Sequence, residues 1–349
     1  MERVARAVAA IRQGAPVVVR GEKKLLMIAA ETATDAGLAK LGKAGRSLLL
    51  THARARTLKI RLYTPDIVAL PIAPDARAEE LRAVADPTVD LDYPLKGPFE
   101  TLRQKLPASY ASAVKLAKLA GLLPAAIVKQ ISKPEKAAVE IAAADIDSYD
   151  GEIVRTLTLV TRARVPLKGA EAAELAAFRA RDSGPEHYAV IIGAPATPGP
   201  VLTRLHSECF TGDLLASLKC DCGEQLRGAI ETIAKQGGGV LLYLAQEGRG
   251  IGLINKLRAY RLQDQGFDTM QANERLGFEA DERLYGIAAR MLHILGYRSV
   301  RLLTNNPAKV AALTAAGIKV VERVAHAFPD NDHNRAYLRT KAKKAGHLL

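Results

Sequence analysis

The sequence predicts a mixed α/β protein of two domains, each a β-sheet packed with helices. Three observations support this prediction. The chain has 349 residues, which is more than one average domain. Short apolar runs rich in β-branched residues alternate with segments whose apolar residues recur at helical spacing. Hydrophobic residues make up 48% of the chain and charged residues 25%, so each half has enough apolar material for a core.

The first half, residues 1–150, is the predicted N-terminal domain. An opening amphipathic segment precedes a strand candidate at 17–19, and a second strand candidate lies at 48–50. Residues 107–131 predict a helix, a break, and then either a strand or a second helix. We place the domain boundary near residue 150.

The second half, residues 151–349, alternates strands and helices more regularly. The helix candidates are 225–233, 253–264, 281–296 and a segment starting at 307, and the strand candidates are 240–244, 300–303 and 319–321. Asp281 is the candidate N-cap of the third helix, and Pro307 suits the first turn of the fourth. Ligands of such sheets bind beyond the carboxyl ends of strands.

The formal net charge of +13 indicates an anionic partner or a strongly solvated surface. Aromatic residues are only 5% and there is no Trp, so a surface that stacks nucleic-acid bases is not indicated. A phosphorylated small molecule needs only a few well-placed Arg and Lys side chains. The N-terminus lacks the apolar stretch of a signal peptide, and no apolar run is long enough to span a membrane. We expect a cytoplasmic protein without a membrane partner.

The three cysteines, Cys209, Cys220 and Cys222, all fall within fourteen residues. An odd number of cysteines without a secretion signal argues against a disulfide framework. Thiolates are soft ligands that select zinc, and three protein ligands with an open fourth position are typical of a catalytic site. Two alternatives are a structural zinc site completed by His206 and a set of buried free thiols. A catalytic zinc would lower the pKa of bound water to about 7.

Two loops in the second half are candidates for anion binding. Residues 247–252 are glycine-rich, follow a predicted strand and contain Arg249, whose guanidinium suits phosphate, although the run matches no nucleotide-binding fingerprint. Thr304 and Lys309 flank the start of the helix at Pro307. In each case a simple turn is the alternative interpretation. Asp281 is either a helix cap or a proton acceptor.

These motifs together resemble GTP cyclohydrolase II, the enzyme that starts riboflavin synthesis. The resemblance covers about residues 155–349 and rests on several motifs in the family's order. The matching runs are RLHSEC at 204–209 with TGD at 211–213, CDCG at 220–223 with QL at 225–226, residues 246–252, NKLRAY at 255–260, LGF at 276–278 with AD at 280–281, LLTNNP at 302–307, and the terminal GHLL at 346–349.

The resemblance implies a role for each matching position. Cys209, Cys220 and Cys222 would hold one zinc ion per subunit. Asp281 would accept a proton, and Arg283 stands where the family has its nucleophile, although a guanidinium is better suited to stabilising charge. Tyr260, whose spacing alone predicts core packing, would join the catalytic residues. The implied GTP contacts are Arg204, Leu205, His206, Ser207, Glu208, Gln225, Glu247, Gly248, Arg249, Thr269, Thr304 and Lys309.

The implied reaction is hydrolysis of GTP, in which the imidazole ring opens at C8 and formate is released. Pyrophosphate leaves as well, with magnesium on the triphosphate, and the product is 2,5-diamino-6-ribosylamino-pyrimidinone 5′-phosphate. Two alternatives are a family variant that stops at the formamidopyrimidine intermediate and a non-catalytic, zinc-containing protein that binds nucleotides or nucleic acid. The family also implies a homodimer.

Residues 1–150 resemble a second family, dihydroxybutanone-phosphate synthase. The likeness rests on the opening helix with Gly14, the strand at 17–19, THxR at 51–54 and AVKLA at 113–117. The acidic cluster with which that family binds magnesium is replaced by RGEKK at 20–24, and its Gly-His-Thr-Glu segment reads ASYA at 108–111. Basic residues do not hold a hard divalent cation. We expect a domain that keeps the fold, lacks synthase activity and has a structural or dimerising role.

Overall fold

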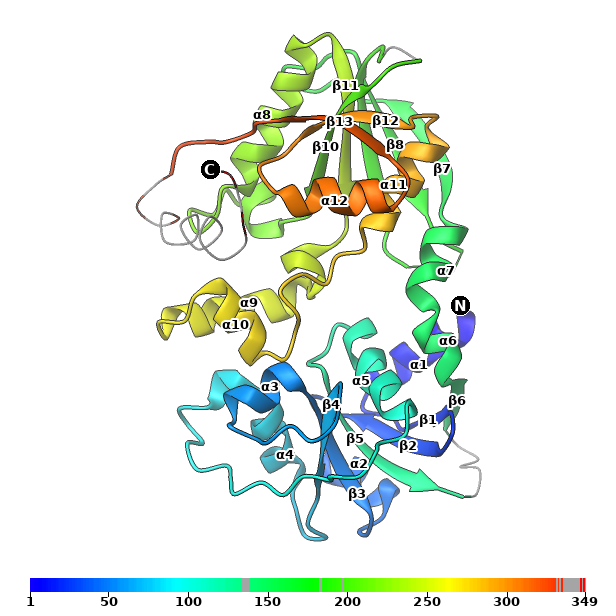
Figure 1. Cartoon of the computed structure of the whole chain (residues 1–349), viewed down its shortest axis with the longest axis vertical. Coiled ribbons are helices and arrows are strands. Elements are labelled where there is room, and N and C mark those ends of the chain that lie inside the picture. Colours follow the sequence, from blue (N-terminus) through cyan, green and yellow to red (C-terminus); the bar gives the residue numbers. More distant parts are fainter. Residues whose placement is uncertain are drawn as a thin grey trace. The chain divides into compact units, whose positions relative to one another are not determined.

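The computed structural model describes residues 1–132, 138–181, 184–195, 198–330, 332, 334, 346 and 348. His347 and Leu349 of the terminal motif lie outside the described residues. The chain forms two compact units (Figure 1). Unit 1 comprises Met1–Tyr149 and Ile254–Glu282, and unit 2 comprises Asp150–Leu253 and Arg283–Leu349. Each unit contains one sheet with helices, so the predicted α/β class is confirmed.

In the described part of unit 1 the strands form a six-stranded sheet with the order β4-β3-β5-β2-β1-β6. The strands are β1 (Val17–Arg20), β2 (Lys24–Ala29), β3 (Arg46–Thr51), β4 (Ile67–Pro71), β5 (Ala125–Ile131) and β6 (Val139–Ala142). The helices are α1 (Glu2–Arg12), α2 (Asp35–Leu41), α3 (His52–Thr57), α4 (Ala78–Ala85), η1 (Pro87–Val89), α5 (Ser109–Leu119), α6 (Ala143–Asp147), α9 (Gly252–Asp264) and α10 (Thr269–Arg275).

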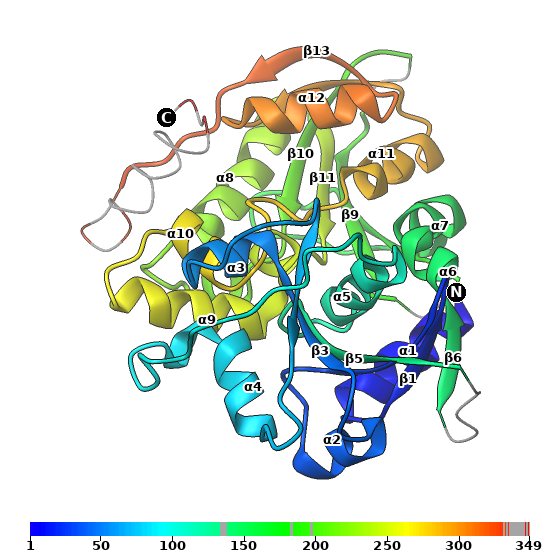
Figure 2. The same ribbon diagram turned by 60° about the horizontal axis from the view of Figure 1, so that its bottom comes forward.

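Both faces of this sheet are apolar because alternate residues along each strand point to opposite sides. Val17 and Met27 belong to the cluster that packs on α1 and α5. Their neighbours Val18 and Ile28 belong to a second cluster, which packs on α2 and α4. Unit 1 is therefore a sheet with a helical layer on each face (Figure 2).

Residues 254–282 pack with unit 1, although the predicted domains are contiguous in sequence. The side chains of Leu276 and Phe278 are buried. Gly277 has φ +87 and no side chain. A Cβ at this position would lie 2.9 Å from Oγ1 of Thr51 and 2.9 Å from Cγ of Pro124, so the backbone approaches these residues closely. The same hydroxyl of Thr51 donates to the carbonyl of Gly277 at 2.8 Å. Burial and this close approach join the segment to unit 1.

In the described part of unit 2 the strands form a seven-stranded sheet with the order β13-β12-β10-β11-β9-β8-β7. The strands are β7 (Thr158–Arg164), β8 (Ala173–Arg179), β9 (His187–Gly193), β10 (Val201–Ser207), β11 (Gly238–Leu244), β12 (Ser299–Leu303) and β13 (Lys319–Val324). The helical segments are α7 (Tyr149–Thr156), η2 (Phe210–Leu214), α8 (Cys222–Lys235), η3 (Glu247–Gly250), α11 (Tyr285–Ile294) and α12 (Pro307–Ala315).

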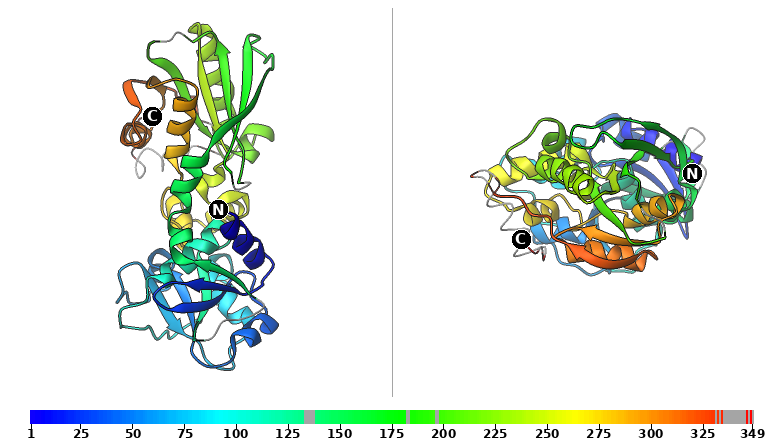
Figure 3. Two further views of the ribbon diagram at one scale, coloured as in Figure 1. Left: turned by 90° about the vertical axis from the view of Figure 1, so that its right-hand side faces the viewer. Right: turned by 90° about the horizontal axis from the view of Figure 1, so that it is seen from above.

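The two faces of this sheet are also covered separately. Leu241 packs with Ile233 of α8, whereas its neighbour Leu242 belongs to the cluster that includes Met291 of α11 and Leu313 of α12. Helix α8 thus covers one face, and α11 and α12 cover the other (Figure 3).

Most predicted elements are present. One open alternative is resolved, and two predictions are corrected. Residues 107–131 form α5 and then the strand β5, which decides between the two alternatives. Strand β11 begins at Gly238, because the glycines after α8 enter the sheet. Asp281 does not cap α11, which starts at Tyr285 after an N-cap at Leu284.

Among the described residues no helix combines the length and hydropathy that crossing a bilayer requires.

Candidate active site

The carboxyl ends of three parallel strands meet at one edge of the unit 2 sheet. Strand β10 pairs in parallel with β11, where Ser207 lies opposite Leu244, and with β12, where Thr203 lies opposite Leu302. The segments that follow these strands hold many of the residues predicted to bind metal or substrate. This edge is where an open α/β sheet binds its ligands.

The three cysteines are gathered at this edge. Cys209 follows β10, and Cys222 is the first residue of α8. The sulfur atoms of Cys209 and Cys220 are 3.7 Å apart. All three sulfur atoms lie within 4.8 Å of one another. Cys209 and Cys220 are buried, and Cys222 is partly buried.

Gly212 makes this arrangement possible. A Cβ at position 212 would lie 2.7 Å from the sulfur of Cys220 and 3.0 Å from that of Cys209. Any larger residue would therefore fill the space into which the sulfur atoms converge. Asp213 fixes the same turn, because its carboxylate accepts a hydrogen bond from the backbone N–H of Cys209 at 3.0 Å.

The chemistry of this group fits zinc. Interaction with Cys209 and burial raise the pKa of the Cys220 thiol to about 11. The pKa of Cys222 is also raised, chiefly by Cys209 and Cys220. These thiols would therefore ionise together only beside a cation, and zinc prefers sulfur ligands. Among the described residues the group contains no fourth ligand, and His206 is not part of it, which favours an open site over a closed structural one.

Arg204, near the end of β10, is a buried cation with a 5% exposed side chain. Its Nη1 donates to the carbonyl of Leu303 at 2.9 Å, and its Nη2 donates to Oε1 of Gln225. Its Nε has no partner among the described residues. Burial lowers the pKa of Arg204 to about 10. A buried guanidinium with an unused donor is suited to binding an anion.

His206 forms a network with Asp213. Its Nε2 lies 3.0 and 3.1 Å from the two carboxylate oxygens of Asp213, which also accepts from the hydroxyl of Tyr243 at 2.9 Å. The rings of His206 and Tyr243 stack 5.5 Å apart. Because an ionised carboxylate only accepts, Nε2 carries the proton and Nδ1 offers a lone pair. Nδ1 is buried without a partner in the described structure, and burial lowers the pKa of His206.

The glycine-rich loop after β11 is tied to the cysteine turn by Glu247. The carboxylate of Glu247 accepts from the N–H of Phe210 at 2.6 Å and from that of Gly248 at 3.0 Å. Gly248 and Arg249 have φ values of +63 and +64. This conformation is costly for a residue with a side chain such as Arg249, and such positions cluster at functional sites.

The loop after β12 has the hydrogen bonds of a capped turn. The hydroxyl of Thr304 accepts from the N–H of Asn306 at 3.0 Å, and the side chain of Asn306 caps α12 through the N–H of Ala308. Lys309 is 7% exposed, and its Nζ donates to the carbonyl of Leu205 at 2.8 Å. The ammonium group of Lys309 is therefore held against β10.

Ser207 and Glu208 follow at the end of β10. The hydroxyl of Ser207 accepts from Nη1 of Arg283 at 3.5 Å. The guanidinium of Arg283 also lies 5.2 Å from the ring centroid of Tyr285. The N–H of Glu208 donates to the carbonyl of Leu244 at 2.8 Å, which continues the pairing of β10 with β11.

Three further predicted site residues belong to unit 1. Tyr260 lies on α9, with Nζ of Lys256 at 5.7 Å from its ring centroid. Thr269 is the first residue of α10, and its hydroxyl accepts from Nε2 of Gln263 at 3.0 Å. Asp281 is exposed in the segment between α10 and α11.

Sequence reasoning assigned no role to several polar residues at the unit 2 edge. Asp213 and Tyr243 are two of them, and Tyr243 was detectable as a polar side chain inside an apolar strand. His326 gave no signal in the sequence. Its Nε2 faces the carbonyl of Gln225 at 2.8 Å, and burial lowers its pKa to about 4. Gln246 is buried, and its Oε1 lacks a partner among the described residues.

Comparison with known proteins identifies relatives of this chain. A sequence model of the family GTP cyclohydrolase II matches residues 158–325. A protein of Azospirillum brasilense named GTP cyclohydrolase-2 is 51% identical over 363 residues, which cover 100% of this chain and 94% of the relative. A riboflavin biosynthesis protein RibBA of Synechocystis sp. is 45% identical over 255 residues, which cover 68% of this chain and 46% of the relative.

One solved structure is also similar. The crystal structure of RibBX, a two domain 3,4-dihydroxy-2-butanone 4-phosphate synthase from A. baumannii, covers 86% of this chain and 93% of its own. The sequence identity is 18% and the TM-score is 0.33. A likeness of this size does not establish a shared fold.

Proposed function

The chain belongs to the GTP cyclohydrolase II family of enzymes, and from this premise we propose that it opens the imidazole ring of GTP and releases formate and pyrophosphate. The product would be 2,5-diamino-6-ribosylamino-pyrimidinone 5′-phosphate. The relative named as a riboflavin biosynthesis protein supports the proposal that this product enters flavin synthesis.

The observation that carries the proposal is the cysteine cluster at the carboxyl edge of parallel strands. Cys209, Cys220 and Cys222 place three sulfur atoms within 4.8 Å. Zinc held there would supply a Lewis acid that makes water a stronger nucleophile near neutral pH. A zinc ion held by these three residues would keep a coordination position for water or substrate, because the group has no fourth protein ligand among the described residues.

The cations of unit 2 suit the triphosphate of GTP. Arg204 is buried with an unused Nε donor, and Lys309 is fixed at the carbonyl of Leu205. We assign both to the binding of phosphate oxygens, since charge-assisted hydrogen bonds are strong in a buried site. Arg283 stabilises negative charge that develops at the α-phosphate, a role that suits a guanidinium better than nucleophilic attack.

His206 acts as a hydrogen-bond acceptor for the substrate. Its Nε2 proton is held by Asp213, so the lone pair of Nδ1 is the free acceptor. The lowered pKa of His206, which results mainly from burial, keeps the ring neutral at neutral pH. A neutral acceptor can bind a donor of the guanine base or of the ribose.

The roles of the unit 1 residues rest on the family resemblance. Asp281 would accept a proton, Thr269 would contact GTP, and Tyr260 favours complete turnover over arrest at the formamidopyrimidine intermediate. Magnesium would accompany the triphosphate because it bridges phosphate oxygens. We also propose a homodimer that acts in the cytoplasm without a nucleic-acid or membrane partner.

The direct test is turnover of GTP by purified full-length protein with zinc and magnesium. We expect formate and an ultraviolet shift from the pyrimidine product, and Cys220→Ser should abolish both signals. Ser217→Ala is a matched control in the same segment, where the hydroxyl accepts from the N–H of Lys219 at 3.3 Å. A pyrimidine product without formate would indicate the formamide-forming variant. Equal turnover by Cys220→Ser would contradict the zinc mechanism.

A further inference from the structure

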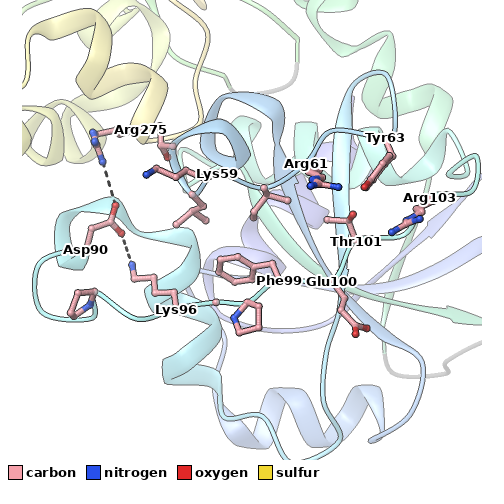
Figure 4. A pocket seen from close by; sticks show the side chains of 16 residues that line it. Lys59, Arg61, Tyr63, Asp90, Lys96, Phe99, Glu100, Thr101, Arg103 and Arg275 are labelled. Carbon is pink, nitrogen blue, oxygen red and sulfur yellow. Dashed lines mark hydrogen bonds and ion pairs between the residues drawn. The ribbon is translucent and has the colours of Figure 1, made fainter.

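A large cavity lies within unit 1, and none of the residues that line it is among the proposed GTP contacts. Its volume is about 970 Å³, and every residue that lines it belongs to unit 1. It is bounded by the end of α3, by residues 94–103 and by Arg275 of α10 (Figure 4). Ligand pockets of proteins span about 300–1,000 Å³, so this volume accommodates a molecule as large as a nucleotide.

The lining of the cavity is strongly cationic. It contains five basic side chains, Lys59, Arg61, Lys96, Arg103 and Arg275, against two carboxylates, Asp90 and Glu100. In Figure 4, Arg61 and Arg103 lie on one side of Phe99, and Lys96 and Arg275 lie on the other. The positive charge therefore surrounds the cavity and is not confined to one rim.

One carboxylate is shared by three of the nearby cations. Asp90 accepts from Nη1 and Nη2 of Arg54 at 2.8 and 2.7 Å, and it also binds Nζ of Lys96. Nη1 of Arg275 lies 3.6 Å from the same carboxylate. Burial lowers the pKa of Lys96, although Asp90 opposes this shift. This side of the cavity thus keeps a surplus of positive charge that an anion would balance.

The three remaining cations of the lining form no ion pairs with described residues. No ion pair to an acidic side chain involves Lys59, Arg61 or Arg103 in the part of the chain that the structure describes. Arg61 lowers the pKa of the Tyr63 hydroxyl, and Arg103 adds to this effect. The guanidinium of Arg103 lies 5.0 Å from the ring centroid of Tyr63. Arg61 and Arg103 thus act together on one point of the rim.

The backbone of Lys59 supports a binding role for the cavity. Lys59 has φ +57 and lies directly after the C-cap of α3, where glycine is the usual residue. A lysine in this position pays a steric penalty that a glycine avoids. The sequence nevertheless places a cation there, at the border of a cavity that is already basic.

We propose that this cavity binds a phosphorylated small molecule, with Arg61 and Arg103 holding its phosphate group. Two guanidinium groups bind phosphate oxygens through paired, charge-assisted hydrogen bonds. Phe99 and Ile60 provide apolar lining for the rest of the ligand. A nucleic-acid strand would instead require cations and aromatic side chains repeated along an extended groove.

The test is isothermal titration calorimetry on the full-length protein with ribose 5-phosphate, adenosine 5′-monophosphate and inorganic phosphate. At least one organic phosphate should bind saturably and more tightly than inorganic phosphate. The double variant Arg61→Ala/Arg103→Ala should weaken this binding by about tenfold or more, since two charge-assisted contacts are lost. Arg3→Ala/Arg6→Ala, which removes two exposed charges from α1 of the same unit, should leave it unchanged.

The two organic probes separate the sources of the phosphate. Equal binding of both would identify a sugar phosphate as sufficient, and binding of the nucleotide alone would identify a nucleotide site. Saturable binding that survives Arg61→Ala/Arg103→Ala would overturn the proposal, because it would place the ligand elsewhere. Equal weakening in both double variants, or no saturable binding of either organic phosphate, would overturn it as well. Loss of GTP turnover is not part of this test, so its outcome is independent of the proposed reaction.

Discussion

Unit 1 buries Arg54 in α3, directly after β3, and unit 2 buries Arg204 near the end of β10; the two arginines have different partners. Arg54 of unit 1 donates from Nη1 and Nη2 to the carboxylate of Asp90 and from Nε to the carbonyl of Val84. Arg204 of unit 2 donates to a carbonyl and an amide, and its Nε lacks a partner among the described residues. The charge of Arg54 is balanced by a bonded carboxylate, whereas no carboxylate is hydrogen-bonded to Arg204 among the described residues.

We infer from this difference that Arg54 is structural, whereas Arg204 has the proposed role in binding phosphate. Burial and residue type are the same in both units, so neither property alone indicates function. Arg204 differs from Arg54 in having no hydrogen-bonded carboxylate and an Nε without a partner among the described residues, but Arg46 of unit 1 shares both features. What sets Arg204 apart from Arg46 is its place at the carboxyl edge of parallel strands, where open sheets bind ligands.

The largest effect is expected on stability, from Arg54→Met. Removing this guanidinium leaves Asp90 with fewer partners and should lower the free energy of unfolding by about 3 kcal/mol. Urea denaturation of the full-length protein would measure it. Arg77→Met is the control, because its ion pair with Glu80 is exposed and should contribute less than about 1 kcal/mol. Equal effects of the two changes would show that Arg54 is not a structural centre of unit 1.

Arg204→Met should show the opposite pattern. The loss of a buried donor toward the phosphates is expected to lower kcat/KM for GTP by a factor on the order of 10² to 10³. The free energy of unfolding should change little, because a buried cation without a bonded carboxylate costs desolvation energy. Steady-state kinetics and urea denaturation of the same preparation would check both. Full activity together with a large loss of stability would show that Arg204 is a structural residue and does not bind phosphate.

Asp213→Asn tests the network that supports the site. Asp213 accepts from His206, Tyr243 and the backbone of Cys209. Residues that orient the ligands of a metal site are worth about 10- to 100-fold in activity or metal affinity, and we expect a loss in that range. Tyr243→Phe removes one of the three hydrogen bonds and should cost about tenfold or less. A larger loss with Tyr243→Phe than with Asp213→Asn would contradict this role of the carboxylate.

Acid should destabilise unit 2 through His187. Burial lowers the pKa of His187 to about 4, and its Nδ1 accepts from the N–H of Ala245 at 3.1 Å. Since the unfolded chain titrates near 6.5, it takes up the proton first as the pH falls. The stability that the neutral ring provides is therefore present above pH 6.5 and is lost between pH 6.5 and 4, by about 3 kcal/mol.

The measurement for this prediction is the free energy of unfolding between pH 7 and pH 4. His187→Asn keeps an acceptor for the N–H of Ala245 and should reduce the pH dependence. His293→Asn, which makes the same substitution in α11 of the same unit, is the control for the change of residue type. The prediction would be refuted by an unchanged pH dependence in His187→Asn.

The last prediction is that the protein lacks synthase activity. Full-length protein should form no product from ribulose 5-phosphate in the presence of magnesium, because residues 20–24 are mainly basic where the synthase family has carboxylates. The assay is colorimetric detection of the diketone formed from the product. Measurable synthase activity would show that unit 1 is not a degenerate domain.

The sequence was sufficient for features that depend on local pattern. Apolar periodicity identified strands such as β12, and the spacing of Cys209, Cys220 and Cys222 indicated a metal group whose sulfur atoms are indeed close together. Pro307 marked the start of α12, where it occupies the first turn. These signals arise from residues that are near each other in the chain.

Features that depend on distant residues were not predictable. Residues 254–282 join unit 1 through contacts such as that between Thr51 and Gly277, which lie 226 positions apart. The cavity of unit 1 combines residues 57–63, 90–103 and 275, and no spacing in the sequence connects them. Asp281 suited a helix cap by type, but the chain stays non-helical until Tyr285.

The most direct test of the proposed zinc site is the metal content of the native full-length protein, measured by elemental mass spectrometry. We expect about one zinc ion per chain in the wild type and in Ser217→Ala, and a large loss of zinc in Cys220→Ser. Wild-type protein that is folded and turns over GTP without zinc, or zinc retained in full by Cys220→Ser, would contradict the proposed zinc site.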